Sequence, residues 1–181
     1  MNRRILSALS LSFGLWLMAP VALADEAKDI ELVYRSGEAQ KALTQADAVI
    51  AAKPRAAAVR FLKGVMLTDL KRRPEAIEVF LALTQDFPEL PDPYNNLAVL
   101  YAADGQLEPA LVALRQALRN DPTHLAAREN LGDVHMALAL QAWGSADAAS
   151  KLENLPLKRK LRLAREIAES PATATAQRSP G

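Results

Sequence analysis

The stretch PDPYNNLAVLYAADGQLEPALVALRQALRNDPTH, residues 91–124, decides the fold of this chain. Its first half places apolar or small residues three and four positions apart, on one helical face: Tyr94, Leu97, Ala98 and Tyr101. Its second half does the same with Ala110, Leu111, Leu114, Ala117 and Leu118. Asp104-Gly105 interrupts the pattern and Asp121-Pro122 ends it, as helix-terminating residues do. The stretch therefore predicts two helices joined by a tight turn.

The same spacing recurs along the chain with a period of 34 residues. It relates the prolines at 54, 88, 122 and 156, and it also relates two series of small residues: Ala42, Ala76, Ala110 and Gly64, Ala98, Gly132. Several interleaved series with one period indicate an array of stacked structural repeats. Each repeat is then a helical hairpin, and small residues at the crossing let its two helices approach closely.

This pattern resembles the tetratricopeptide repeat, which has a 34-residue period and an aromatic–leucine–glycine–tyrosine, alanine–phenylalanine and proline signature. The unit at 91–124 matches it best. The second unit keeps Gly64, Ala76, Phe80 and Pro88. The fourth keeps Leu131, Gly132 and Pro156 but has Ala139 where a turn is expected, which predicts a hairpin that bends differently or has a longer first helix. The resemblance implies an all-α, right-handed solenoid of three to four hairpins with a C-terminal capping helix.

The predicted organisation is a signal peptide, a repeat domain and a tail. Residues 1–24 have two arginines, an apolar stretch and an Ala-Leu-Ala ending, which is typical of a cleaved secretory signal; an uncleaved membrane anchor is the alternative. The other predicted segments are a solenoid at 25–169, with repeats at about 25–56, 57–90, 91–124 and 125–158 and a cap at 157–169, and a disordered tail at 170–181. Export without cysteine favours a bacterial periplasm or secretion.

Composition excludes several classes of protein. There is no cysteine, so disulfides, thiolate metal sites and thiol catalysis are ruled out. The 22 basic and 21 acidic residues nearly cancel; removing Arg3 and Arg4 with the signal leaves 20 against 21, a net charge of −1. Balanced charge gives no general attraction to nucleic acid. A hydrophobic share of 50% is too high for a disordered chain.

Candidate chemistry is sparse. His124 and His135 are 11 residues apart, whereas a helical metal pair needs three or four, so packing or surface roles are favoured. Glu129 and Asp133 lie one helical turn apart and could hold an ion or substrate, although a solvated helix surface is the commoner reading. The basic run at 157–162 suits a capping helix, with contact to anionic lipid as the alternative. The sequence predicts no enzyme, no cofactor and no metal.

The family resemblance implies a peptide-binding groove lined by the first helix of each repeat. The positions of this chain that match the groove positions of the family are Phe61, Val65, Asp69, Asp92, Asn95, Asn96, Val99, Glu129, Asn130 and Asp133. The basic clamp with which chaperone-binding relatives hold a carboxylate is missing, and an acidic groove favours a neutral or basic segment. Asn at 96 and 130 could equally support the repeat structure.

Two functions follow from these observations. The first is a periplasmic scaffold or adaptor that holds a peptide or helix of an envelope protein in the groove. The second is a structural solenoid that assembles with itself, or lies on a membrane through its basic C-terminal helix.

Overall fold

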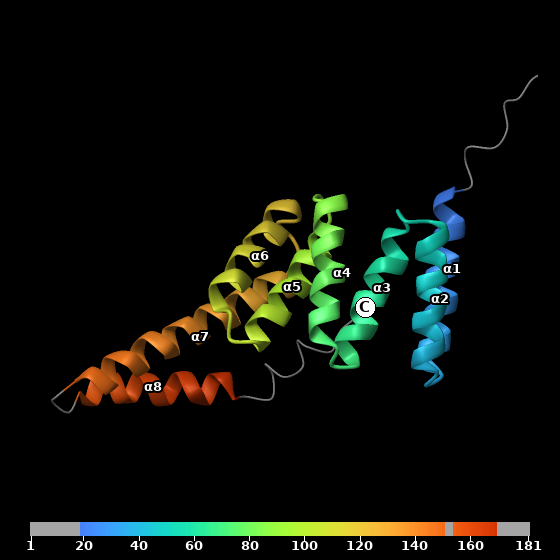
Figure 1. The fold of residues 1–181 in the computed structure, drawn as a ribbon. Helices are drawn as coiled ribbons and strands as arrows, with labels where there is room; N and C mark the ends of the chain where they lie inside the picture. Colours follow the sequence, from blue (N-terminus) through green and yellow to red (C-terminus); the bar gives the residue numbers. More distant parts are fainter. Residues whose placement is uncertain (1–18, 151–153, 170–181) are drawn as a thin grey trace, which may run out of the picture. The chain divides into compact units, whose positions relative to one another are not determined.

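The computed structural model describes residues 19–150 and 154–169, with side chains from residue 26 onward. These ranges form eight helices and no strand, so the predicted all-α class is confirmed. The helices are α1 (Ala19–Arg35), α2 (Ala39–Ala52), α3 (Ala57–Asp69), α4 (Arg73–Asp86), α5 (Pro91–Ala103), α6 (Leu107–Asn120), α7 (Leu125–Ala149) and α8 (Leu155–Ala168) (Figure 1). Residues 1–18 of the predicted signal and the predicted tail lie outside the described ranges.

The described residues divide into two compact units, one that ends at residue 59 and one that begins at residue 60. In the first unit α1 packs against α2, and the pair buries Ile30, Ala42, Leu43 and Ala46. Helix α1 begins at Ala19, upstream of the cleavage site expected after Ala24, so the helix runs through that junction. Among the described residues, no helix combines the length and apolarity that a membrane crossing requires.

In the second unit each helix packs on the next along the chain. Helix α4 packs against α5, α5 against α6, α6 against α7 and α7 against α8 (Figure 1). The core consists of large side chains with almost no exposed surface: Met66, Leu67, Phe80, Leu83 and Leu114. Burial of these faces between neighbouring helices supplies the main stabilisation of a repeat fold.

Gly64 of α3 lies directly against the Phe80 ring of α4. A Cβ atom at this position would lie 2.6 Å from Cζ and 2.7 Å from Cε1 of Phe80. The Phe80 ring is fully buried and meets Phe61 edge-on, with 5.6 Å between the ring centroids. The ring occupies the space that a side chain at 64 would need, which explains the small residue there.

The 34-residue period is visible in the turns that join the two helices of each hairpin. Gly37, Lys71 and Gly105 are 34 residues apart, and each has a positive φ, at 90°, 62° and 73°. After α3 and α5 the chain closes with the same bond, Arg72 N to Leu67 O and Gln106 N to Tyr101 O, as in a Schellman motif. A left-handed residue is thus a shared requirement of these turns.

Lys71 meets this requirement at an energetic cost, because a left-handed backbone is strained in a residue with a Cβ atom. We expect Lys71→Gly to raise the free energy of unfolding by about 1 kcal/mol. Urea denaturation followed by circular dichroism would measure the change. The reciprocal variant Gly105→Lys should lose a similar amount, and an unchanged midpoint in both variants would contradict the role given to this turn.

The fourth unit differs from the predicted hairpin at 125–158. Ala139, at the position equivalent to the left-handed residue of the other units, continues the helix, and α7 runs for 25 residues. Alanine is the strongest helix former, so nothing local ends the helix at this point. Pro156 lies in the first turn of α8, where its missing N–H is no cost, instead of following a helix. Helix α8, over the region expected to form a separate cap, is the second arm of a long α7–α8 hairpin.

Candidate binding site

Helices α5 and α7 approach each other on one side of the second unit, and a pair of amides joins them. Nδ2 of Asn130 on α7 donates to Oδ1 of Asn95 on α5 at 2.8 Å. Both side chains are half-buried, so the amides that the sequence placed in the binding groove bridge two successive repeats. The Asn130 carbonyl oxygen and the Asn95 amino group are the remaining polar atoms of the pair.

A pocket of about 260 Å³ lies beside this amide pair, between α5, α6 and α7. We call it the α5–α7 pocket. Most of its lining is apolar or small, and it consists of Ala98, Val99, Ala102, Ala103, Leu107, Leu114, Asn130, Asp133, Val134 and Ala137. The four alanines create the space because their short side chains leave it unfilled. Ala98, Leu114 and Val134 of the lining are buried.

The polar rim of the α5–α7 pocket is acidic. Asp133 lines the pocket, and Glu129 lies one helical turn before it on α7. Partial burial raises the pKa of Asp133 above its usual value, and repulsion by the Glu129 carboxylate adds to that increase. Since both causes oppose the ionised form, a neighbouring cation would relieve them.

Polar contacts surround the first residues of α5 and α7, where the predicted groove begins. His124 is the N-cap of α7: its Nδ1 accepts from the Ala127 N–H at 3.1 Å, and its Nε2 lies 3.1 Å from Oδ1 of Asp92. Asn96 donates to the Asp92 carbonyl oxygen at 2.9 Å. The Asp92–His124 contact therefore joins the beginnings of α5 and α7, whereas the Asn96 bond lies within α5, and His124 is a capping residue. His135 is exposed.

The three predicted groove residues on α3 are not brought to the pocket. Phe61 packs on Phe80 inside the α3–α4 hairpin. Val65 is half-buried and Asp69 is exposed near the end of α3. Of the ten predicted residues, Val99, Asn130 and Asp133 line the pocket, and Asn95 and Glu129 adjoin it.

Sequence reasoning missed most of the pocket wall. Leu107 and Leu114 come from α6, whereas the family positions used for the groove belong to the first helices only. Ala103, Val134 and Ala137 lie on the first helices α5 and α7 themselves, but they were not among the predicted residues. The available signal was the density of alanine where α5 and α7 would face each other, since small residues at a helix crossing leave either a close contact or a space.

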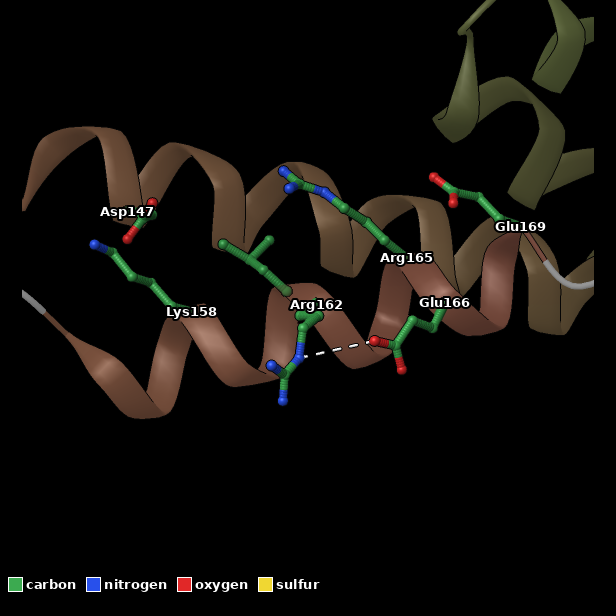
Figure 2. A pocket seen from close by; sticks show the side chains of 7 residues that line it. Asp147, Lys158, Arg162, Arg165, Glu166 and Glu169 are labelled. Atoms are coloured by element: carbon green, nitrogen blue, oxygen red, sulfur yellow. Dashed lines mark ion pairs between the residues drawn. The ribbon is translucent and has the colours of Figure 1, made fainter.

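A larger concavity of about 380 Å³ lies at the other end of the unit, between α7 and α8. Figure 2 shows the basic side chains Lys158, Arg162 and Arg165 and the acidic side chains Asp147, Glu166 and Glu169 that line it, and Leu161 completes the lining. Nε of Arg162 lies 3.8 Å from Oε1 of Glu166. The opposite charges balance, and this concavity offers no net field to a charged ligand.

Over the described ranges, no group of three or more His, Asp or Glu side chains is arranged to hold a metal ion. The expectation that the chain has no metal, no cofactor and no catalytic activity stays a prediction.

Comparison with known proteins places this helical array in a family. A family model described as tetratricopeptide repeat matches residues 31–91, which include the α3–α4 hairpin with its Gly64–Phe80 contact. The residues of this match belong to the tetratricopeptide repeat family, and the helical array has the fold of solved tetratricopeptide repeat proteins. Proteins of this family bind other proteins or peptides, and this chain is a protein–protein interaction module of that kind.

Solved structures share its fold. A MamA structure from Desulfovibrio magneticus has a TM-score of 0.56 at 21% identity, covering 82% of this chain and 78% of that one. A tetratricopeptide repeat protein from Parabacteroides merdae gives 0.59 at 12% identity, covering 88% and 64%. YrrB, described as having an unusual peptide-binding site, gives 0.55 at 17% identity, covering 82% and 79%. Among curated proteins, none matches the sequence significantly.

Proposed function

We propose that this tetratricopeptide repeat protein binds an extended segment of a partner protein across α5 and α7. The observation that carries the proposal is the Asn95–Asn130 amide pair beside the α5–α7 pocket. An amide offers both a donor and an acceptor, the two groups that an extended peptide backbone presents. The pocket adds a place for one side chain, and together they form a polar grip next to an apolar anchor point.

The charges around the pocket favour a neutral or basic segment. Glu129 and Asp133 stand on the same face of α7, and Asp92 lies at the start of α5. An acidic segment would meet like charge on both helices, which lowers the rate of encounter and the affinity. The segment is therefore expected to carry no acidic residue opposite α7.

We further propose that the protein works in a bacterial periplasm as a scaffold or adaptor for an envelope protein. The support is the sequence alone: the charged start, apolar stretch and Ala-Leu-Ala ending of residues 1–24, and the absence of cysteine in all 181 residues. A chain that meets oxidising conditions avoids unwanted disulfides in this way.

A second candidate function rests on α8. Leu163 and Ile167 are one turn apart and exposed, at 45% and 56%, and Arg159 lies on the same side of the helix. A basic surface with exposed aliphatic side chains suits contact with anionic lipid or with another copy of the chain. Helix α8 is the last helix of the second unit and contributes no residue to the α5–α7 pocket. Binding through α8 would therefore not involve that pocket.

Affinity capture from cell envelopes distinguishes the two functions. We expect the double variant Glu129→Lys/Asp133→Lys to remain folded, because both residues are exposed, and to lose the partner that the wild-type protein holds. The matched control Glu78→Lys/Glu108→Lys reverses two exposed acids on α4 and α6, away from the pocket, with the same change in net charge. The control should retain the partner.

Retention of the same partner by all three proteins would remove the interaction from α5 and α7 and favour the α8 surface. Loss in both variants would show a general effect of charge, and the proposed grip would be wrong.

A further inference from the structure

We propose that the α5–α7 pocket receives a lysine side chain of the bound segment, with its aliphatic stem in the pocket and its ammonium group at Asp133. This inference rests on the proposed function and specifies the residue that the partner inserts. The shape of the pocket, the position of the carboxylates and the lack of an ion pair to Glu129 or Asp133 support it.

The interior of the pocket fits an aliphatic stem. Its floor is made by Ala98, Leu114 and Val134, which are between 0 and 4% exposed, and its walls add Val99, Ala102 and Leu107. The volume of about 260 Å³ is below the roughly 300–1,000 Å³ of typical small-molecule sites. A single unbranched side chain therefore suits the space better than a larger ligand.

The acidic groups stand where the end of such a side chain would emerge. Asp133 is exposed at the rim, although the next residue, Val134, is buried at the floor. The Asn130 carbonyl oxygen is a second acceptor on the same helix, and Glu129 adds a second negative charge one turn away. An ammonium group has three donors and no acceptor, which matches this set of oxygens.

The protein does not neutralise this charge itself. Within the described residues neither Glu129 nor Asp133 makes an ion pair, whereas Asp86 pairs with Arg60 and Asp104 pairs with Arg73. Arg128, the nearest basic residue in sequence, donates instead to the Pro122 carbonyl oxygen. A partner cation would supply the missing counter-charge.

Alternative anchors fit less well. A wholly apolar side chain would cover Asp133 and remove more water from it, adding to the burial that already raises its pKa. An arginine fork is best matched by a carboxylate pair or by one carboxylate approached edge-on, whereas lysine delivers a compact charge at the end of a flexible stem. Lysine also buries its stem while its charged end stays in water, as this rim requires.

A fragment titration tests the inference without a known partner. Protein purified from cells expressing the full-length chain is labelled with ¹⁵N and titrated with n-butylammonium, which reproduces the lysine side chain, and with 1-butanol, its neutral counterpart. We expect both to shift the amide signals of Val99, Ala102 and Ala137, with n-butylammonium binding about tenfold more tightly, as a hydrogen bond to a charged group implies.

The variant Asp133→Asn should bring the two dissociation constants together while 1-butanol still binds. The control Glu108→Gln removes an exposed acid from α6 and should keep the preference. Acidification that protonates Asp133 should abolish the preference in the wild-type protein in the same way.

Equal binding of the two fragments, or a preference that survives in Asp133→Asn, would overturn the lysine assignment. In that case a partner lost by Glu129→Lys/Asp133→Lys would leave the proposed function standing, because capture does not depend on the fragment. Amide signals that shift only outside the α5–α7 pocket would also overturn the lysine assignment. The proposed function would be refuted separately if Glu129→Lys/Asp133→Lys still captured the partner.

Discussion

Gly64→Leu should cost about 3 kcal/mol of unfolding free energy, the upper end of typical overpacking penalties. The reason is the Phe80 ring, which lies 2.6 Å from the position of the new Cβ and cannot turn aside without breaking its contact with Phe61. Even Gly64→Ala should lose stability, although alanine is ordinarily the better helix former. Urea denaturation, followed by the helical circular dichroism signal, measures both.

Gly132→Ala is the matched control. Gly132 lies inside α7, and no heavy atom would come within 4 Å of an added Cβ. The same substitution should therefore raise the unfolding free energy by about 0.5–1 kcal/mol, because only the helix propensity changes. If the glycine-to-alanine substitution lowers the unfolding free energy at 64 and raises it at 132, the effect of packing is separated from that of helix propensity.

A second-site change tests the cause. Phe80→Leu shortens the side chain that blocks position 64, so Gly64→Ala should cost less in the Phe80→Leu background than in the wild type. If the two substitutions add independently, the steric account of Gly64 is wrong.

The period of the prolines shows how far sequence reasoning could go. Pro54, Pro88 and Pro122 each stand two residues after a helix, since α2, α4 and α6 end at 52, 86 and 120. Pro156 continues the spacing but begins α8. Spacing alone does not distinguish a proline that follows a helix from one that starts the next, because both positions tolerate its missing N–H.

The turn positions, unlike the prolines, distinguish the fourth unit from the other three. Residues 37, 71 and 105 are left-handed, and position 139 is not. Ala139 was recognisable as a departure in the sequence, whereas the outcome, a 25-residue helix with α8 folded back on it, depends on how α7 and α8 pack. Lys71 gave no signal of its conformation, because lysine rarely adopts it and the surrounding turn imposes it.

The candidate site was foreseeable on α5 and α7 but not on α3. Asn95, Val99, Asn130 and Asp133 lie on the predicted face, since the family register fixes which side of the first helix faces the next repeat. Phe61 instead packs on Phe80, because an aromatic ring beside Gly64 gains more from the apolar interior of its own hairpin. The pocket itself depends on the space left by four alanines, and assigning each residue to a position of the repeat does not reveal such a space.

Binding across α5 and α7 predicts a sharp difference in crosslinking between two valine positions. A photoreactive amino acid at Val99, on the lining of the α5–α7 pocket, should form a crosslink to the partner. The same amino acid at Val112, which is 64% exposed on α6 and absent from that lining, should form none. Substitution of valine at both sites keeps the chemical change identical, so a difference in crosslinking reports location alone.

The most direct measurement of the central claim is this crosslink in intact cells, followed by mapping of the joined peptide. The account predicts a single adduct at position 99 that contains an extended partner segment, is absent at position 112 and disappears in the Glu129→Lys/Asp133→Lys background. Crosslinks to the same partner at 112 but not at 99 would place binding on the second helices and contradict the account.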